Sequence, residues 1–266
     1  QRLDEFFVKQ NLSTYRRTRR FLQEHTVLVN GIRALEAGML LDARTDMLSI
    51  DGIPQYLPRE IYIMMNKKSG YVSANKDGQH PTVFDLLDES YRTPYLQENL
   101  HLVGRLDMDT EGLLLFTTDG ALTHRMTSPK SHSPKSYFVR LAKEENEGSQ
   151  KRIEEAFEKG VCIPPEDNEP EADCKPAKIN WLNGTENVLT ITEGKYHQVK
   201  RMFRAVENEV VYLKRLTIGS LKLDENLALG EYRELTEEEI DLLLNPCSDV
   251  NSKKQIGHSE FKTCVR

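Results

Sequence analysis

Apolar residues recur along the chain in short runs separated by turn residues, and the clearest run lies at residues 113–116. It consists of three leucines and a phenylalanine, and the turn residues Thr-Thr-Asp-Gly end it at 117–120. A short apolar run with such borders predicts a strand buried on both faces. The turn before it carries Arg105 and Asp107, and the strand anchors this turn to the core. An aspartate held rigidly there is costly to desolvate, so the pair indicates a site rather than packing.

The first part of the chain predicts two helices followed by a small sheet. Leu3, Phe6 and Phe7 follow helical spacing, and Ser13 is placed to cap a second helix. Asn-Gly at 30–31 separates two apolar runs and predicts a hairpin, because both residues tolerate positive φ. We expect this unit to span residues 1–57.

A second, larger domain is predicted for residues 58–245, after a linker flanked by two prolines. The strands expected here are 61–65, 113–116, 137–141, 177–182, 187–192, 210–218 and 232–235. Helices are expected at 82–87, 121–126, 143–160 and 236–244, and after residue 196, where Val199, Met202, Phe203 and Val206 form a buried stripe. Residues 246–266 are polar and weakly patterned, which predicts a flexible tail.

Composition and charge limit the class of protein to which the chain can belong. The chain has 266 residues, 29% of them charged and 38% hydrophobic, as in an ordinary globular protein. No apolar run approaches the roughly 20 residues that span a bilayer, and the first residues lack a signal-peptide pattern, so we expect no membrane and a cytoplasmic location. Four widely spaced cysteines favour reduced thiols. A monomer is the default expectation.

The net charge of −6 argues against nucleic acid as a partner only if the charges are evenly spread. Phosphate contacts are local, and a sum over the whole chain hides a basic face. Arg16, Arg17, Arg19 and Arg20 lie within five positions of the second predicted helix. An acidic loop at 164–176 carries much of the negative charge, and we expect it to face away from any bound nucleic acid.

Metal binding is the first alternative for the acidic turn. Asp107, Asp109 and Glu111 match the opening of a calcium-binding loop, but that loop needs a glutamate at its twelfth position, where Thr118 stands. The histidines and cysteines show no ligand spacing either, so no metal is expected. A second alternative is that Asp107 only caps a turn.

The string Gly104-Arg105-Leu106-Asp107, followed by Thr110, Gly112 and the leucine run, resembles the signature motif of the pseudouridine synthases. It is most similar to the RsuA-type branch, which acts on small-subunit ribosomal RNA. In that family the aspartate of Arg-Leu-Asp is catalytic, which implies this role for Asp107. The resemblance covers about residues 1–245 and implies an α+β fold, with a mixed, mainly antiparallel sheet and flanking helices in the catalytic domain.

Further site residues follow from the same resemblance. Lys135-x-Tyr137 matches the family's second motif, whose tyrosine stacks on the target base, whereas the pattern alone favours Tyr137 as a core aromatic. A basic residue after His-Gln-Val pairs with the aspartate, which implies Lys200, with Arg201 as its rival. Arg201 and Arg105 are also expected to bind RNA.

Residues 1–57 resemble the αL RNA-binding module also found in a ribosomal small-subunit protein. The resemblance implies RNA contacts by the four clustered arginines, whereas a charge run is usually a solvated helix face. The expected partner is ribosomal RNA, either small-subunit RNA or the assembling small subunit.

The chemistry that the resemblance implies suits these residues. A uridine inside folded RNA must be extruded before its glycosidic bond can react. Arg105 could fill the vacated place, and Tyr137 could stack on the base. An ionised Asp107 could act as a nucleophile on sugar or base, or remove a ribose proton, and these routes stay open. No redox step occurs, so no cofactor is expected. A large-subunit substrate and a non-catalytic RNA-binding assembly factor are the alternatives.

Overall fold

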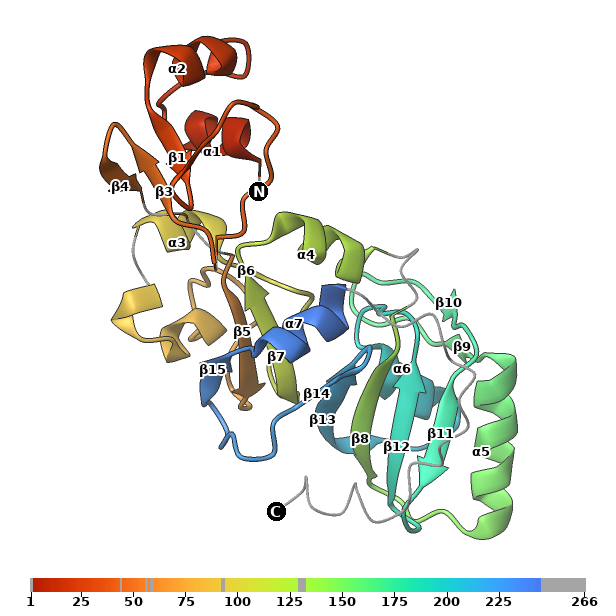
Figure 1. The fold of residues 1–266 in the computed structure, drawn as a ribbon. Helices are drawn as coiled ribbons and strands as arrows, with labels where there is room; N and C mark the ends of the chain where they lie inside the picture. The colour runs from red at the N-terminus through yellow and green to blue at the C-terminus, as the bar shows by residue number, and fades with distance from the viewer. Residues whose placement is uncertain are drawn as a thin grey trace. The chain divides into compact units, whose positions relative to one another are not determined.

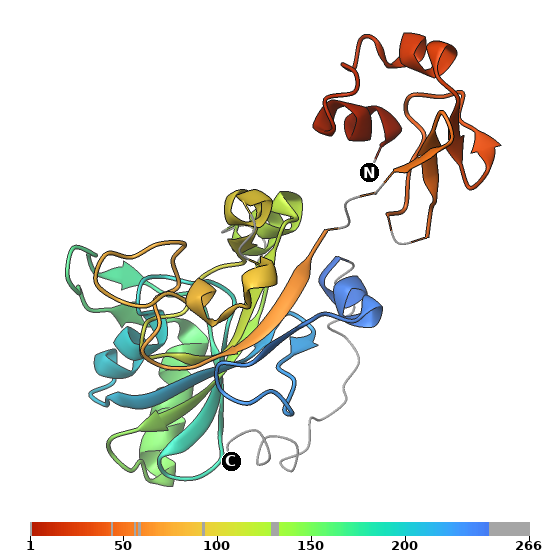
Figure 2. The ribbon, with the colours of Figure 1, turned by 90° about the vertical axis from the view of Figure 1, so that its left-hand side faces the viewer.

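The chain divides into two compact units, residues 1–60 and 61–266, in a computed structural model that describes residues 2–43, 45–55, 57, 60–91, 94–128 and 133–244. Figures 1 and 2 show the ribbon from two directions. The tail predicted at 246–266 lies outside the described residues. Each unit has its own core and is described separately.

The first unit pairs two helices with a small antiparallel sheet in the strand order β2-β1-β3-β4. Its elements are α1 Leu3–Lys9, α2 Thr18–Glu24, β1 Val27–Val29, β2 Ile32–Arg33, β3 Leu48–Ile50 and β4 Ile53–Gln55. Asn30 and Gly31 have φ of 52° and 79°, which confirms the predicted hairpin. A second turn of this kind, at Asp51 and Gly52, joins β3 to β4.

The start of the second helix was predicted wrongly. Ser13 does not cap it: the Ser13 hydroxyl donates to the Thr14 carbonyl, and the helix begins four residues later, at Thr18. The Thr18 hydroxyl bonds back to the Thr14 carbonyl at 3.0 Å, so a turn precedes the helix. Of the four clustered arginines, Arg16 and Arg17 therefore lie on the turn, and Arg19 and Arg20 lie on the helix.

The second unit is built on a nine-stranded sheet with the main order β11-β12-β8-β13-β7-β5-β15, to which β14 and β6 are added beside β13 and β7. Its strands are β5 Tyr62–Lys67, β6 His101–Leu102, β7 Glu111–Thr117, β8 Lys135–Leu141, β11 Lys178–Trp181, β12 Glu186–Ile191, β13 Val210–Ile218, β14 Leu221–Lys222 and β15 Tyr232–Glu234. β7 and β13 pair in parallel, whereas the other pairs are antiparallel. The predicted mixed, mainly antiparallel α+β fold is confirmed.

Helices cover both faces of this sheet. They are α3 Pro94–Asn99, α4 Gly120–Thr127, α5 Glu147–Lys159, α6 Gln198–Ala205 and α7 Glu237–Leu244, with the 3-10 turns Val83–Leu86 and Glu89–Tyr91. One apolar cluster joins α5 and α6 to one face, and another joins α4 and α7 to the other. Figure 2 shows teal α6 and blue α7 on opposite sides of the sheet. A short hairpin, β9 Cys162–Ile163 and β10 Ala172–Asp173, follows α5.

β7 is the central strand that positions the candidate site. All seven of its residues are buried, as the apolar run predicted. Gly112 on this strand has φ of 99°, and a Cβ there would lie 2.2 Å from the carbonyl oxygen of Arg215 on β13. Only glycine lets the two parallel strands approach this closely at the end of the turn that carries Asp107.

Candidate active site

Asp107 lies in a turn that backbone contacts hold in place. Leu106 is 6% exposed and belongs to the core cluster beneath α6. The hydroxyl of Ser73 donates to the Leu106 carbonyl at 2.7 Å and accepts from its amide at 3.1 Å. The Thr110 amide donates to the Asp107 carbonyl and closes the turn. The backbone of Asp107 is therefore fixed on both sides.

Lys67, at the end of β5, holds the same turn from below. Its side chain is fully buried, and its ammonium lies within hydrogen-bond distance of the carbonyl oxygens of Lys68, Asp107, Met108 and Thr110, at 2.8 to 3.3 Å. Burial lowers the pKa of Lys67 to about 8, although Asp109, Asp107 and Glu111 oppose this shift. The predicted strand ended at residue 65, two residues before Lys67, so this contact was not predicted.

The Lys200 ammonium lies between two carboxylates of the turn. Its Nζ is 3.1 Å from Oδ2 of Asp107 and 2.6 Å from Oδ1 of Asp109. Burial disfavours the charge on Lys200, but the two carboxylates outweigh burial and raise its pKa. Burial likewise opposes the charge on Asp109, and Lys200 outweighs it, so the pKa of Asp109 is lowered. Lys200 and Asp109 are therefore both charged at neutral pH.

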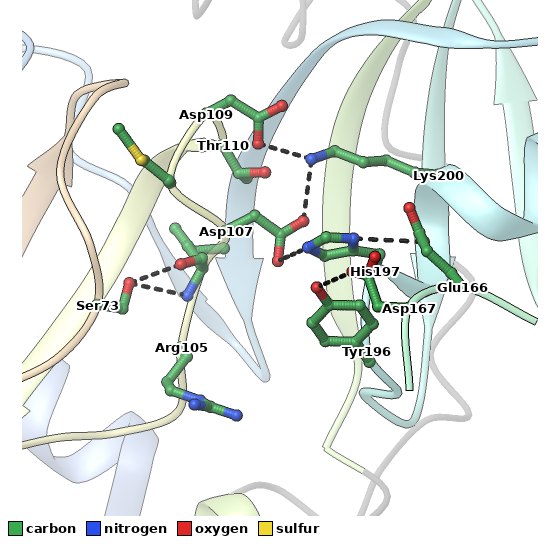
Figure 3. A network of polar contacts seen from close by, with 12 residues as sticks. Ser73, Arg105, Asp107, Asp109, Thr110, Glu166, Asp167, Tyr196, His197 and Lys200 are labelled. Carbon is green, nitrogen blue, oxygen red and sulfur yellow. Dashed lines mark hydrogen bonds and ion pairs between the residues drawn. The ribbon is translucent and has the colours of Figure 1, made fainter. Parts of the chain in front are cut away.

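His197 borders Asp107 on the other side (Figure 3). Its Nε2 lies 3.7 Å from Oδ1 of Asp107, and its Nδ1 lies 3.3 Å from Oε2 of Glu166. The ring stacks on Tyr196 with centroids 3.8 Å apart, and the Tyr196 hydroxyl donates to Asp167. His197 has φ of 46°, which few residues other than glycine adopt. The sequence suggested the motif but not this strained backbone.

These side chains surround a cavity of about 340 Å³ in the second unit. It is lined by Ser69, Gly70, Asp107, Met108, Asp109, His197 and Lys200. The Asp107 side chain is 27% exposed and the Lys200 side chain 14% exposed, so the carboxylate is reachable but partly shielded from water. Such a cavity, with convergent polar groups and shifted pKa values, is a candidate active site.

The other predicted site residues do not line this cavity. Arg105 is exposed, and its side chain extends away from Asp107 (Figure 3). Tyr137 is 8% exposed, lies on β8 in the core cluster, and is not part of the cavity lining. Its stacking role stays a prediction. The four clustered arginines are all exposed, and Arg20 pairs with Glu24 at 2.7 Å.

The prediction that Arg201 binds RNA is wrong. Arg201 is 1% exposed, and its guanidinium donates to the carbonyls of Pro164, Tyr196 and Pro170. It points inward beside the buried Met202 and ties the acidic loop to α6. The expected position of that loop must also be corrected. Glu166 contacts His197 and pairs with Arg204 at 2.8 Å, so the start of the loop lies against the candidate site.

The residues that the structure describes form neither a metal-binding cluster nor a membrane-spanning helix. No group of three or more histidine, cysteine, aspartate or glutamate side chains there could hold a metal ion. Within the same residues, no helix is long and apolar enough to cross a membrane.

Comparison with known proteins gives a consistent result. Residues 61–205 match the family model described as RNA pseudouridylate synthase. The chain is 43% identical to an uncharacterized RNA pseudouridine synthase of Bacillus subtilis, over 92% of this chain and 99% of that protein. It is also 43% identical to ribosomal small subunit pseudouridine synthase A of Escherichia coli, over 90% and 98% of the two chains. A crystal structure of a pseudouridylate synthase aligns with a TM-score of 0.61 and 37% identity, covering 91% of this chain and 99% of that one.

Proposed function

This chain belongs to the RNA pseudouridylate synthase family and is an RNA pseudouridine synthase, and we propose that it isomerises one uridine of small-subunit ribosomal RNA with Asp107 as its catalytic residue. The observation that carries this proposal is the 3.1 Å ion pair between Asp107 and Lys200 inside the cavity. The name of the Escherichia coli relative supports the choice of RNA.

The reaction begins with eversion of the target nucleotide, since the glycosidic bond is inaccessible inside a folded RNA. Arg105 is exposed beside the turn and is free to enter the place that the base leaves. Tyr137 offers an aromatic face on which the uracil can stack, which recovers part of the lost stacking energy. Because Tyr137 is largely buried, this role requires the base to reach it from the rim of the core.

Asp107 then assists cleavage of the bond between ribose and ring nitrogen, after which the base rotates and bonds to the ribose through carbon five. Carbon five loses its proton, and the released ring nitrogen gains one, so the product is an isomer of the substrate. The carboxylate has to be ionised at this stage. The Lys200 ammonium attracts this carboxylate at 3.1 Å, and bound RNA strengthens that attraction by excluding water from the cavity. No electron or phosphoryl group is transferred, so the proposal requires no cofactor.

The N-terminal unit, residues 1–57 in the proposal, supplies RNA affinity rather than chemistry. Arg16, Arg17, Arg19 and Arg20 are exposed and can reach phosphates. A module that binds backbone adds affinity without choosing the base.

Turnover of purified protein on transcribed small-subunit and large-subunit ribosomal RNA tests the proposal. The parent should form pseudouridine in the small-subunit RNA, and Asp107→Asn should lower the rate at least about a thousandfold. RNA affinity and thermal unfolding should stay near parental values, because the amide keeps the size of the side chain. Asp241→Asn, an exposed aspartate on α7, is the matched control and should retain activity. Modification confined to the large-subunit RNA would reject the substrate, and an active Asp107→Asn would reject the residue.

A further inference from the structure

Lys135, the first residue of β8, has an incompletely satisfied ammonium group. Its side chain is half-buried, and its Nζ donates to the carbonyl of Ser133 at 3.1 Å. A lysine ammonium has three donors, so this one contact leaves most of its capacity unused. In the described ranges no carboxylate lies within ion-pair distance of it. A half-buried lysine without an acidic partner is uncommon, because buried charges are normally paired.

Arg215 on β13 is a second cation on the same face of the sheet. It pairs across the strands with Tyr137, which is two residues from Lys135 and therefore on the same face of β8. Arg215 is 2% exposed. Its Nε donates to the Leu113 carbonyl at 2.8 Å, its Nη1 lies 3.5 Å from the Arg105 carbonyl, and its buried Nη2 has no hydrogen-bond partner among the residues that the structure describes. All of these acceptors are neutral.

The positive charges of Lys135 and Arg215 repel each other, and no negative charge among the described residues balances them. Burial lowers the pKa of Lys135, and Arg215 lowers it further, while no carboxylate acts in the other direction. Holding two positive groups on one partly dry surface costs free energy of folding. Functional sites often retain such destabilising features, and two unbalanced cations suit the binding of an anionic ligand.

The two cations lie on strands close to the turn that carries Asp107. On its other side, Arg215 pairs with Gly112 at the start of β7, directly after the turn that carries Asp107. β8 therefore lies two strand spacings, about 10 Å, from that turn. Tyr137, the residue proposed to stack on the everted base, lies between Lys135 and Arg215 on this face.

We propose that Lys135 binds a backbone phosphate of the RNA at or beside the everted uridine, and that Arg215 beneath it supplies fixed positive potential. The inference rests on the proposed function, whose substrate carries phosphodiester groups as its anions. A lysine ammonium binds phosphate as a compact point charge, whereas the buried Arg215 is held by carbonyls and cannot move to the ligand. Lys135 thereby positions the nucleotide whose base enters the site.

Lys135→Met and Lys135→Arg test the phosphate site, with Lys178→Met as the matched control, since Lys178 is exposed on β11 of the same sheet. Binding of transcribed small-subunit ribosomal RNA is measured at several salt concentrations. Lys135→Met should weaken binding about tenfold and lower the salt slope by about one unit. Lys135→Arg should keep the slope, and the control should change neither quantity.

Thermal unfolding without RNA separates a binding role from a structural one. Removing an uncompensated cation should leave the melting temperature of Lys135→Met equal to or above the parental value. An unchanged salt slope, or a lower melting temperature with unchanged RNA affinity, overturns the phosphate site. Turnover of the same RNA by the parent is measured in parallel. If the parent does not modify this RNA, the proposed function fails; if the parent modifies it and Lys135→Met binds it normally, only the phosphate site fails.

Discussion

The Lys200 ammonium forms ion pairs with both Asp107 and Asp109, and it lies closer to Asp109. Asp109 is 69% exposed and closer to the ammonium, at 2.6 Å, than the less exposed Asp107. The outer carboxylate holds the cation at the mouth of the cavity. Under the proposed function, the Asp107 carboxylate needs a neighbour that stabilises its charge and leaves its second oxygen accessible. Asp109 therefore helps to position Lys200 beside Asp107.

Lys67 gives stability a pH dependence with a definite sign. Its pKa is about 8 in the folded chain, below its ordinary value of 10.5. Between these values the unfolded chain binds more protons than the folded chain, so the contribution of Lys67 to the free energy of unfolding rises with pH. The slope is at most about 1.4 kcal/mol per pH unit. Below about pH 8 both states are protonated, and the contribution is constant.

Urea denaturation of the parent and of Lys67→Met at several pH values measures this contribution. The parent should gain stability relative to the variant as pH rises from about 8 to about 10.5. The variant should also be less stable throughout, because three carbonyls of the Asp107 turn lose their donor. Lys178→Met, which replaces an exposed lysine, is the control for loss of a lysine side chain. A constant difference for Lys67→Met would show that Lys67 titrates outside this range.

The positions of individual side chains were predicted correctly from the sequence only where a short sequence motif determined them. The motif resemblance put Lys200 beside Asp107, and the structure has that pair. It failed for Arg201, because two of the three carbonyls that hold this guanidinium belong to residues 164 and 170, more than 30 positions away. The contacts of Lys67 were missed for the same reason, since three of its four acceptors lie 40 to 43 residues along the chain.

At the scale of elements, the periodicity of apolar residues predicted the helices and strands that carry the core. β7, β8, β13 and α6 lie where it placed them, because each buries a continuous apolar stripe. It did not reveal β9, β10 and β14, which are two residues long and have no stripe. The wrong start of α2 has a similar cause: a cap requires a hydroxyl oxygen that accepts from a backbone amide, whereas the Ser13 hydroxyl donates to the Thr14 carbonyl.

Gly112→Ala should disrupt the pairing of β7 with β13. The new methyl group would lie 2.2 Å from the Arg215 carbonyl oxygen, in a backbone with φ of 99°. The strands would have to separate at the residue that follows the Asp107 turn, which should cost about 3 kcal/mol or more. Urea denaturation measures the cost. Gly78→Ala is the control, because its methyl group meets open space, and it should stay within about 0.5 kcal/mol of the parent. Equal stability of the two variants would contradict the close approach.

At the scale of the whole molecule, a chain with a net charge of −6 is proposed to bind a polyanion. This is possible if positive charge is concentrated where RNA meets the protein. In the N-terminal unit, Arg16, Arg17 and Arg19 are exposed, whereas the acidic residues of the 164–176 loop belong to the catalytic unit. The location of the charge, and not its sum, then determines RNA affinity.

Two triple variants with the same change in net charge separate location from sum. The first replaces Arg16, Arg17 and Arg19 with glutamine, and the second replaces the exposed Lys151, Arg152 and Lys159 of α5 with glutamine. The first should lower the salt slope of RNA binding by about two to three units and leave turnover at saturating RNA near the parental rate, because the catalytic unit is untouched. The second should leave both quantities nearly unchanged. If the two variants weakened binding equally, the sum of charges would govern affinity, and the N-terminal arginines would be only a solvated face.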